Sequence, residues 1–398
     1  MSKEKRVEKI KKMLFVSLKN LFHNQTDLNF DEFSVCIIES LMLLEREVYL
    51  KSEAGKNDSG NGAYVRKFSC LRRNSLQISI PRSRNGKFKP MTMELLHRQK
   101  EQVNELALLL YRKGMSSRDI SAILDEYFGE SMSRETINNL AESFHEIRKA
   151  WEDTTLDSTY KVVYCDALFT NLKRGNNYSK EAVHIMYGLK ENNTRELLLL
   201  EVNPTEGSNN WGNYFNKIKQ RGVKDIDLVV ADGLKYLENQ VNENFPNANF
   251  QKCVVHLQRG MLLKVRPKDK HEFSKDFKEF FDNFDTTSTK EKAYDKLLTF
   301  VAKWKNSYPK MVARLVEEGY IDHYFTYIGY CTDVRRMIYT TNTIENLNRQ
   351  IRKVLKTKVS FNKEKNLLDL VLMIIRDIQM TTWKYPINQF KLFERIHP

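Results

Sequence analysis

The stretch of residues 227–259 limits the folds open to this chain more than any other part of the sequence. Residues 228–231 form a short, apolar, β-branched run, and apolar positions then recur at helical spacing from residue 234. Asp232 follows the predicted strand directly. Open α/β sheets bind ligands at the carboxyl ends of strands, so Asp232 is a candidate functional residue, although an Asp-Gly pair also suits an ordinary turn or a helix cap. A second buried strand is predicted over residues 250–255.

The charge balance of the chain indicates a polyanionic partner. Its 398 residues include 65 Lys and Arg against 51 Asp and Glu, a formal net charge of +14. This excess is typical of nucleic-acid-binding proteins and also fits a membrane surface. The five cysteines are scattered and form no Cys-x-x-Cys pair, and no apolar run approaches the roughly 18 to 20 residues that span a bilayer. We expect a soluble, basic, cytoplasmic protein with no membrane partner.

The first 90 residues are predicted to form a helical region with short strands and a basic turn. Helical periodicity covers residues 1–50, and strand-like runs follow at 64–71 and 76–80. The Asn-Gly turn after the second run carries Arg82 and Arg84. These side chains suit contacts with DNA phosphates, and a solvated loop is the alternative.

Residues 91–152 are predicted to contain three helices in the outline of a helix-turn-helix. The first covers about residues 93–113, Ser116 caps the second, and Ser133 caps the third. In a helix-turn-helix the third helix would enter the major groove. Its side chains of the types that read base edges are Arg134, Asn138 and Asn139. Helical bundles that do not bind DNA share this outline.

The remainder of the chain predicts an α/β fold with a helical insertion. Strands at 161–169, 181–189 and 195–202 suggest a β-meander, and the alternating units described above follow it. No strand pattern occurs between residues 259 and 336, which predicts an all-helical insertion. A long helix then starts near residue 341. Its predicted outward basic face includes Arg349, Arg352 and Lys353.

Three acids stand out by their positions. Asp166 lies among apolar residues of the first predicted strand, where an unpaired charge is costly. Asp232 ends a later strand, and Glu345 lies in the first turn of the long basic helix. Each also has an ordinary explanation: Asp166 on a solvent face, Asp232 as a cap, and Glu345 in a capping box with Asn342. Together, three carboxylates would hold two Mg²⁺ ions, or Mn²⁺ in their place, for attack on a phosphodiester.

Several long phrases of the sequence resemble transposases of the IS256 (Mutator-like) family. The resemblance extends from about residue 80 to 375 and rests on these segments: Val-Val-Ala-Asp-Gly-Leu at 229–234, Asn-Phe-Gln-Lys-Cys-Val-Val-His-Leu-Gln-Arg at 249–259, and Thr-Thr-Asn-Thr-Ile-Glu-Asn-Leu-Asn-Arg at 340–349. It implies a DDE transposase with an RNase H-like catalytic core, in which Asp166, Asp232 and Glu345 bind the metal ions. The core would comprise residues 153–258 and 337–398, separated by the insertion at 259–336.

The resemblance also implies roles for three further residues. Cys253 and His256 match a Cys-x-x-His signature beside the active site, and as half of a zinc site they are better explained as buried supports than as metal ligands. Trp304 matches an aromatic residue of the insertion that contacts DNA, with core packing as the alternative.

The predicted function is binding of terminal inverted repeats, followed by strand cleavage and transfer to target DNA. The family suggests a copy-out, paste-in route through a circular intermediate. Two ends must meet in one complex, which predicts a homodimer on double-stranded DNA. The alternatives are a catalytically silent DNA-binding regulator descended from a transposase, and an RNase H-like nuclease or resolvase.

Overall fold

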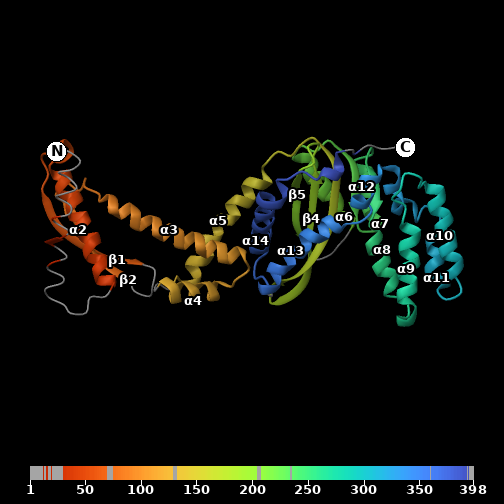
Figure 1. Cartoon of the computed structure of the whole chain (residues 1–398), viewed down its shortest axis with the longest axis horizontal. Helices are drawn as coiled ribbons and strands as arrows, with labels where there is room; N and C mark the ends of the chain where they lie inside the picture. The colour runs from red at the N-terminus through yellow and green to blue at the C-terminus, as the bar shows by residue number, and fades with distance from the viewer. Residues whose placement is uncertain are drawn as a thin grey trace. The chain divides into compact units, whose positions relative to one another are not determined.

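The computed structural model describes residues 12, 15, 16, 19, 30–69, 75–128, 132–203, 208–233, 235–358, 360–391 and 393. The chain divides into two compact units, residues 1–143 and 144–398. Figure 1 shows the elements of both in chain order. Most of the helical pattern predicted before residue 30 lies outside the described residues.

The first unit begins with a helix packed on a two-stranded sheet. Helix α2 (Phe30–Leu50) precedes β1 (Gly60–Ser69) and β2 (Ser75–Ser83), which pair antiparallel. Both predicted strands are therefore confirmed. The core between α2 and the sheet consists of apolar side chains from all three elements: Met42, Phe68, Leu76, Ile78 and Ile80. The predicted turn follows β2, and Gly86 adopts a φ of 69° there, a conformation that favours glycine.

Three helices complete the first unit and lead into the second. They are α3 (Met91–Arg112), α4 (Ser117–Phe128) and α5 (Arg134–Glu152). The predicted caps are present, because the Ser116 hydroxyl accepts a hydrogen bond from the Asp119 N–H at 3.1 Å, and the Ser133 hydroxyl accepts one from the Thr136 N–H at 3.0 Å. The helices are confirmed, whereas their use as a DNA-binding helix-turn-helix stays a prediction.

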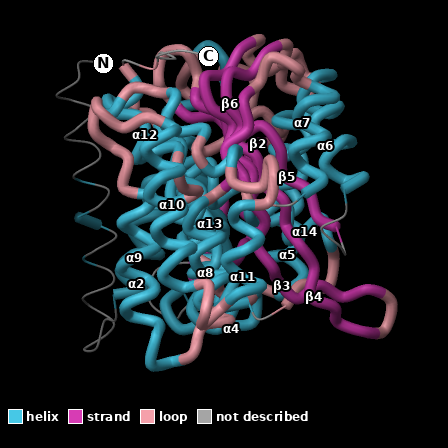
Figure 2. The backbone as a smooth tube through the Cα atoms, turned by 90° about the vertical axis from the view of Figure 1, so that its right-hand side faces the viewer, coloured by secondary structure: helices cyan, strands magenta, loops and turns pink. Residues whose placement is uncertain are grey.

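The second unit is built on a five-stranded mixed sheet of order β5-β4-β3-β6-β7. The predicted meander is confirmed, since β4 (Asn177–Leu189) pairs antiparallel with both β3 (Thr159–Arg174) and β5 (Arg195–Asn203). β6 (Asp225–Ala231) and β7 (Asn249–Lys252) run parallel to β3. The paired ends of β3 and β4 form a long hairpin (Figure 2).

Helices cover both faces of this sheet, and the alternation of β3 side chains decides which face each residue meets. Val163 and Cys165 belong to a core cluster with side chains of α6 (Ser208–Gln220) and α7 (Lys235–Asn244). Tyr164 turns the other way and donates a hydrogen bond to the Met337 carbonyl at 2.9 Å. Asp166 lies on this second face.

The second face is covered by the last two long helices. α13 (Asn342–Lys358) and α14 (Glu364–Ile378) contact β3 and β5, respectively. As predicted, α13 is amphipathic. Its buried side is Ile344, Leu347, Asn348, Ile351 and Leu355. α14 is buried around most of its circumference.

Among the described residues, no helix combines the length and apolar character needed to span a bilayer.

The segment between β7 and α13 contains no strand, as predicted, and residues 259–336 are all described. Its helices are α8 (Val254–Leu262), α9 (Lys270–Phe281), α10 (Lys290–Trp304), α11 (Pro309–Ala313) and α12 (Thr332–Ile338). Aromatic rings make up much of its core: Phe273, Phe277, Phe280, Phe281, Phe300, Trp304 and Phe325. The phenylalanines of α9 recur at three- and four-residue steps, so their rings share one helix face.

One predicted strand is wrong in extent. We expected a strand over residues 250–255, but β7 ends at Lys252 and α8 begins at Val254. Cys253 is the N-cap residue of that helix, and His256 lies in its first turn. A short apolar run fits a buried strand and a buried helix equally well, and here the helix begins within the run.

Candidate active site

Three neighbouring strands present the candidate residues in one row. Cys165 of β3 pairs with Ala231 of β6, which in turn pairs with Lys252 of β7. The residues that come next in the chain are Asp166, which continues β3, and Asp232 and Cys253, which directly follow β6 and β7. Adjacent strands lie about 4.8 Å apart. The parallel register therefore brings together two acids that are distant in sequence.

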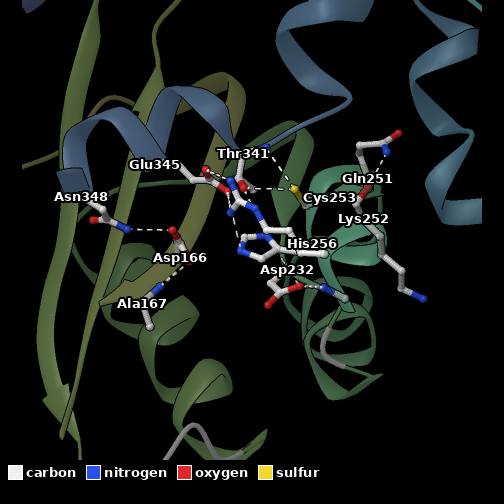
Figure 3. Close-up of polar contacts among 12 residues, drawn as sticks. Asp166, Ala167, Asp232, Gln251, Lys252, Cys253, His256, Thr341, Glu345 and Asn348 are labelled. Carbon is white, nitrogen blue, oxygen red and sulfur yellow. Dashed lines mark hydrogen bonds and ion pairs between the residues drawn. The ribbon is translucent and has the colours of Figure 1, made fainter. Parts of the chain in front are cut away.

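Asp166 is a half-buried carboxylate that accepts hydrogen bonds from two N–H donors. The Ala167 N–H donates to Oδ1 at 2.8 Å, and the Asn348 side-chain amide donates to Oδ2 at 2.7 Å (Figure 3). Burial raises the pKa of Asp166 to about 6, although the Ala167 hydrogen bond and the positive charge of His256 act in the opposite direction. Within the described parts of the chain, no ion pair neutralises this side chain. α13 covers this face of the sheet, so Asp166 does not lie on an open solvent face.

His256 lies between the other two acids (Figure 3). Its Nδ1 is 3.8 Å from Oδ1 of Asp232, and its Nε2 is 3.7 Å from Oε1 of Glu345. A hydrogen bond with Cys253 and the charges of Asp232 and Asp166 raise the pKa of His256 to about 9, against the effect of burial. The ring is therefore a cation at neutral pH, and it bridges two carboxylates.

Glu345 makes a bidentate ion pair. Arg259 donates from Nη1 to Oε1 at 2.8 Å and from Nη2 to Oε2 at 3.0 Å. The described contacts of the Glu345 carboxylate include none with Asn342, so the capping box is not formed. Glu345 is instead turned from α13 toward α8.

Side chains at the start of α8 contact Thr341, the residue that precedes α13. Cys253, His256 and Arg259 lie on one face of α8 because three residues correspond to nearly one helical turn. The Cys253 sulfur is 3.1 Å from the Thr341 hydroxyl and also accepts a hydrogen bond from the Thr341 N–H at 3.3 Å. Thr341 Oγ1 is 3.4 Å from Nδ1 of His256. Cys253 is thus a fully buried support that fixes the approach of α13.

A cavity of about 840 Å³ joins these residues. Asp166, Asp232 and Glu345 all line it, together with His256 and Arg259. The α13 side chains that line its other wall are Arg349, Gln350, Arg352, Lys353 and Lys356. Three acids thus lie in a depression that is otherwise basic, a combination suited to a cation and a polyanion together.

The donor set of the cavity fits a hard divalent cation. Carboxylate oxygens are the ligands that Mg²⁺ and Mn²⁺ prefer. As they stand, however, no three His, Cys, Asp or Glu side chains in the described residues are grouped closely enough to hold a metal ion. Arg259 is paired with the Glu345 carboxylate, and His256 lies 3.8 Å from Asp232.

The predicted DNA-binding residues lie in three places. Arg349, Arg352 and Lys353 are exposed on α13 at the cavity. In the first unit, Arg82 and Arg84 are exposed around the turn after β2, and the Arg82 guanidinium lies over the Tyr64 ring at 5.5 Å. The exposed residues of the first turns of α5 include the remaining three: Arg134, Asn138 and Asn139.

Trp304 lies in the core of the insertion. Its indole is 6% exposed, packs against Phe273 and Tyr308, and donates a hydrogen bond to Asp276 at 2.9 Å. Packing therefore accounts for this residue, and in this structure its ring faces are not free to stack on a base.

Two site residues were missed by the sequence reasoning. Arg259 ends the segment 249–259, and no role was predicted for it. The sequence feature that could have identified it is its spacing of three residues from His256, which itself follows Cys253 by three. Asn348 follows Glu345 by three residues, which places both on one face of α13. An asparagine at a predicted buried helix position is costly without a partner, and this was the available signal.

The chain resembles known transposases over nearly its whole length. The family described as Transposase, Mutator family matches residues 7–385. The transposase of insertion sequence IS905 from Lactococcus lactis is 30% identical over 377 residues, 92% of each chain. The transposase of IS1201 from Lactobacillus helveticus is 29% identical over 321 residues, 80% of this chain and 84% of the relative. The transposase of IS256 in transposon Tn4001 from Staphylococcus aureus is 25% identical over 369 residues, 90% and 92% of the two chains.

The fold and the site define a mixed α/β protein in which three acids line one basic cavity beside the sheet. The chain belongs to the Mutator, or IS256, family of transposases. The family resemblance inferred from the sequence phrases is thereby confirmed.

Proposed function

We propose that this protein is a DDE transposase that binds the terminal inverted repeats of its insertion sequence and cleaves and joins DNA strands at those ends. The observation that carries the proposal is the row formed by β3, β6 and β7, which sets Asp166 beside Asp232 at the mouth of a cavity that Glu345 also lines. Family membership supports the same activity.

In this proposal Asp166, Asp232 and Glu345 hold two divalent ions, Mg²⁺ or Mn²⁺. When bound, the ions would activate a water or a 3′-hydroxyl and stabilise the leaving oxygen of the phosphodiester. The protein's own contribution is orientation. Asn348 and the Ala167 N–H fix both oxygens of Asp166, and Thr341 and Cys253 fix the helix that carries Glu345.

The basic side of α13 supplies the DNA contact near the chemistry. Arg349, Arg352 and Lys353 line the cavity without entering its buried part, as phosphate contacts require. Arg82 and Arg84 would add phosphate contacts from the first unit, and the exposed side chains at the start of α5 would read bases: Arg134, Asn138 and Asn139.

We assign the domains in the same terms. Residues 91–152 form the helix-turn-helix, 153–258 and 337–398 the RNase H-like core, and 259–336 the helical insertion. A three-stranded meander continued by parallel strands supports the core assignment. Joining two transposon ends requires two copies, so the working species on double-stranded DNA is a homodimer, and the route is copy-out, paste-in through a circle.

Purified full-length protein, a duplex carrying the element's terminal repeat, and Mg²⁺ test the proposal. Cleavage or joining should appear on denaturing gels with wild-type protein. Asp232→Asn should abolish it while the affinity for the same duplex, measured by fluorescence anisotropy, stays unchanged. A fully active Asp232→Asn variant would refute the metal-binding role.

One observation favours a second candidate, the catalytically silent regulator. Glu345 is paired with Arg259, and His256 lies beside both Glu345 and Asp232. Specific binding to the terminal repeats without cleavage in Mg²⁺ or Mn²⁺ would select the regulator.

A further inference from the structure

The ion pair between Arg259 and Glu345 uses the same carboxylate oxygens that would bind a metal ion. Both carboxylate oxygens of Glu345 accept hydrogen bonds from Arg259, at 2.8 and 3.0 Å. His256 Nε2 lies 3.7 Å from Oε1. The Arg259 fork engages one lone pair on each oxygen of the Glu345 carboxylate, so a cation that approaches Glu345 from the same side has to displace Arg259.

The Arg259–Glu345 ion pair lies at the edge of an open cavity, where it can dissociate. The Arg259 side chain is 58% exposed and that of Glu345 is 21% exposed, and both line the open cavity. Exposed ion pairs contribute little to stability, so opening this one has a small free-energy cost. The neighbouring basic residues of α13 do not share this role, because Arg349 bonds to the Asn346 side chain at 2.9 Å and makes no described contact with Glu345.

The guanidinium that is set free would face a polyanion. Its fork of N–H donors matches a phosphate as well as it matches a carboxylate. Arg259 lines the cavity opposite the basic face of α13, so a DNA backbone lying along that face comes within its reach. Binding of the phosphate to Arg259 therefore releases Glu345, and binding of the cation to Glu345 releases Arg259.

We propose that Arg259 is a DNA phosphate-binding residue that Glu345 occupies in the free protein, and that this exchange makes the binding of DNA and of the divalent cation mutually favourable. The inference rests on the proposed function. Linkage requires the coupling to be reciprocal: the cation must strengthen DNA binding by the same factor by which DNA strengthens cation binding. Arg259 is thus a substrate-binding residue whose free-state partner is a metal ligand.

Calorimetric titration of Mn²⁺ into the DNA-free full-length protein tests the first part of the proposal, that Arg259 is paired with Glu345 in the free protein. Arg259→Gln should bind Mn²⁺ roughly threefold to tenfold more tightly than wild type, because Glu345 is free in the variant. Arg349→Gln removes the same charge from the same cavity and should show a smaller gain. Equal gains in the two variants would show that only the cavity's net charge matters, and the inference would be overturned.

The affinity for DNA, measured with and without Mn²⁺, tests the second part of the proposal, that Arg259 binds a DNA phosphate once Glu345 binds the cation. Fluorescence anisotropy with a short duplex of unrelated sequence reports phosphate contacts without strand cleavage. Arg259→Gln should match wild type without Mn²⁺ and bind several-fold more weakly than wild type with it, whereas Arg349→Gln should be weaker under both conditions. A loss for Arg259→Gln that is the same with and without Mn²⁺ would overturn the exchange.

The two proposals fail in different ways. If wild type and both variants bind no Mn²⁺, the metal-dependent function falls and this inference falls with it. If all three bind Mn²⁺ with equal affinity, the function stands and only the exchange is overturned. Thermal melts of both variants control for folding, and an exposed arginine replaced by glutamine should leave them unchanged.

Discussion

Two aspartates of the second unit that face inward have different surroundings. Asp369 on α14 is 5% exposed, and Arg148 donates to its Oδ1 from Nε at 2.6 Å. Asp166 on β3 is half-buried, and its described hydrogen bonds come only from the neutral donors of Ala167 and Asn348. A buried charge with a cation beside it is a structural element. A half-buried carboxylate that forms no described ion pair and lines a cavity is a candidate for a functional site.

The Asp166→Asn substitution should have the largest effect on function. The change keeps the shape of the side chain and removes its charge, so activity on a terminal-repeat duplex should fall by roughly three orders of magnitude. The rate of strand cleavage in Mg²⁺ is the measurement. Asp369→Asn is the matched control. If it were to lower the rate per folded molecule as much as Asp166→Asn does, the contrast between the two aspartates would be lost.

The Asp369→Asn substitution should have the largest effect on stability. It leaves the Arg148 guanidinium, which is 9% exposed, without its main buried partner. The free energy of unfolding should drop by about 2 to 4 kcal/mol, with Glu152 still able to pair with Arg148. Urea denaturation measures this drop. Glu152→Gln, which removes only the more exposed partner, should cost less than half as much, and equal costs would contradict the assignment.

Asn348→Ala tests whether Asp166 needs its neutral donor. Removing the amide leaves Oδ2 of Asp166 without a partner and lets the carboxylate turn. Cleavage should slow by roughly 10-fold to 100-fold, which is typical when a group that orients a metal ligand is removed. Binding to the duplex should not change. Unaltered cleavage would show that the strand alone orients Asp166.

The pH dependence of stability should give the smallest effect. The folded-state pKa of Asp166 is raised from 3.8 to about 6, so folding favours the protonated form. Its contribution to stability is therefore present below pH 3.8 and is lost as the pH rises through 6. In buffer with a metal chelator, wild type should lose about 1 to 2 kcal/mol relative to Asp166→Asn between pH 5 and 8.

Urea denaturation of both proteins at each pH measures that difference. Mn²⁺ should restore the stability of wild type at pH 8 and leave Asp166→Asn nearly unchanged, because a bound cation favours the charged carboxylate. Parallel pH curves for the two proteins would mean that Asp166 is not the group responsible.

Periodicity in the sequence was enough to predict most elements of the fold. Apolar residues recur at every second position in strands and at every third or fourth position in helices. These patterns predicted the meander of β3, β4 and β5, the insertion without strands and the amphipathic α13. Caps at Ser116 and Ser133 predicted the starts of α4 and α5, because a hydroxyl bonded to a free N–H is a local interaction. The strand predicted through Val255 was wrong because the apolar run has no periodicity that separates strand from helix.

The sequence by itself determined which residues form strands and helices and which acids are candidates, because these depend on neighbours a few positions away. Only the tertiary structure decided that Asp166, Asp232 and Cys253 stand in one row, since strand register joins residues that no local pattern relates. It likewise decided that Arg259 holds Glu345 and that Trp304 is buried. Packing between distant elements sets these contacts, and a single sequence carries no local record of them.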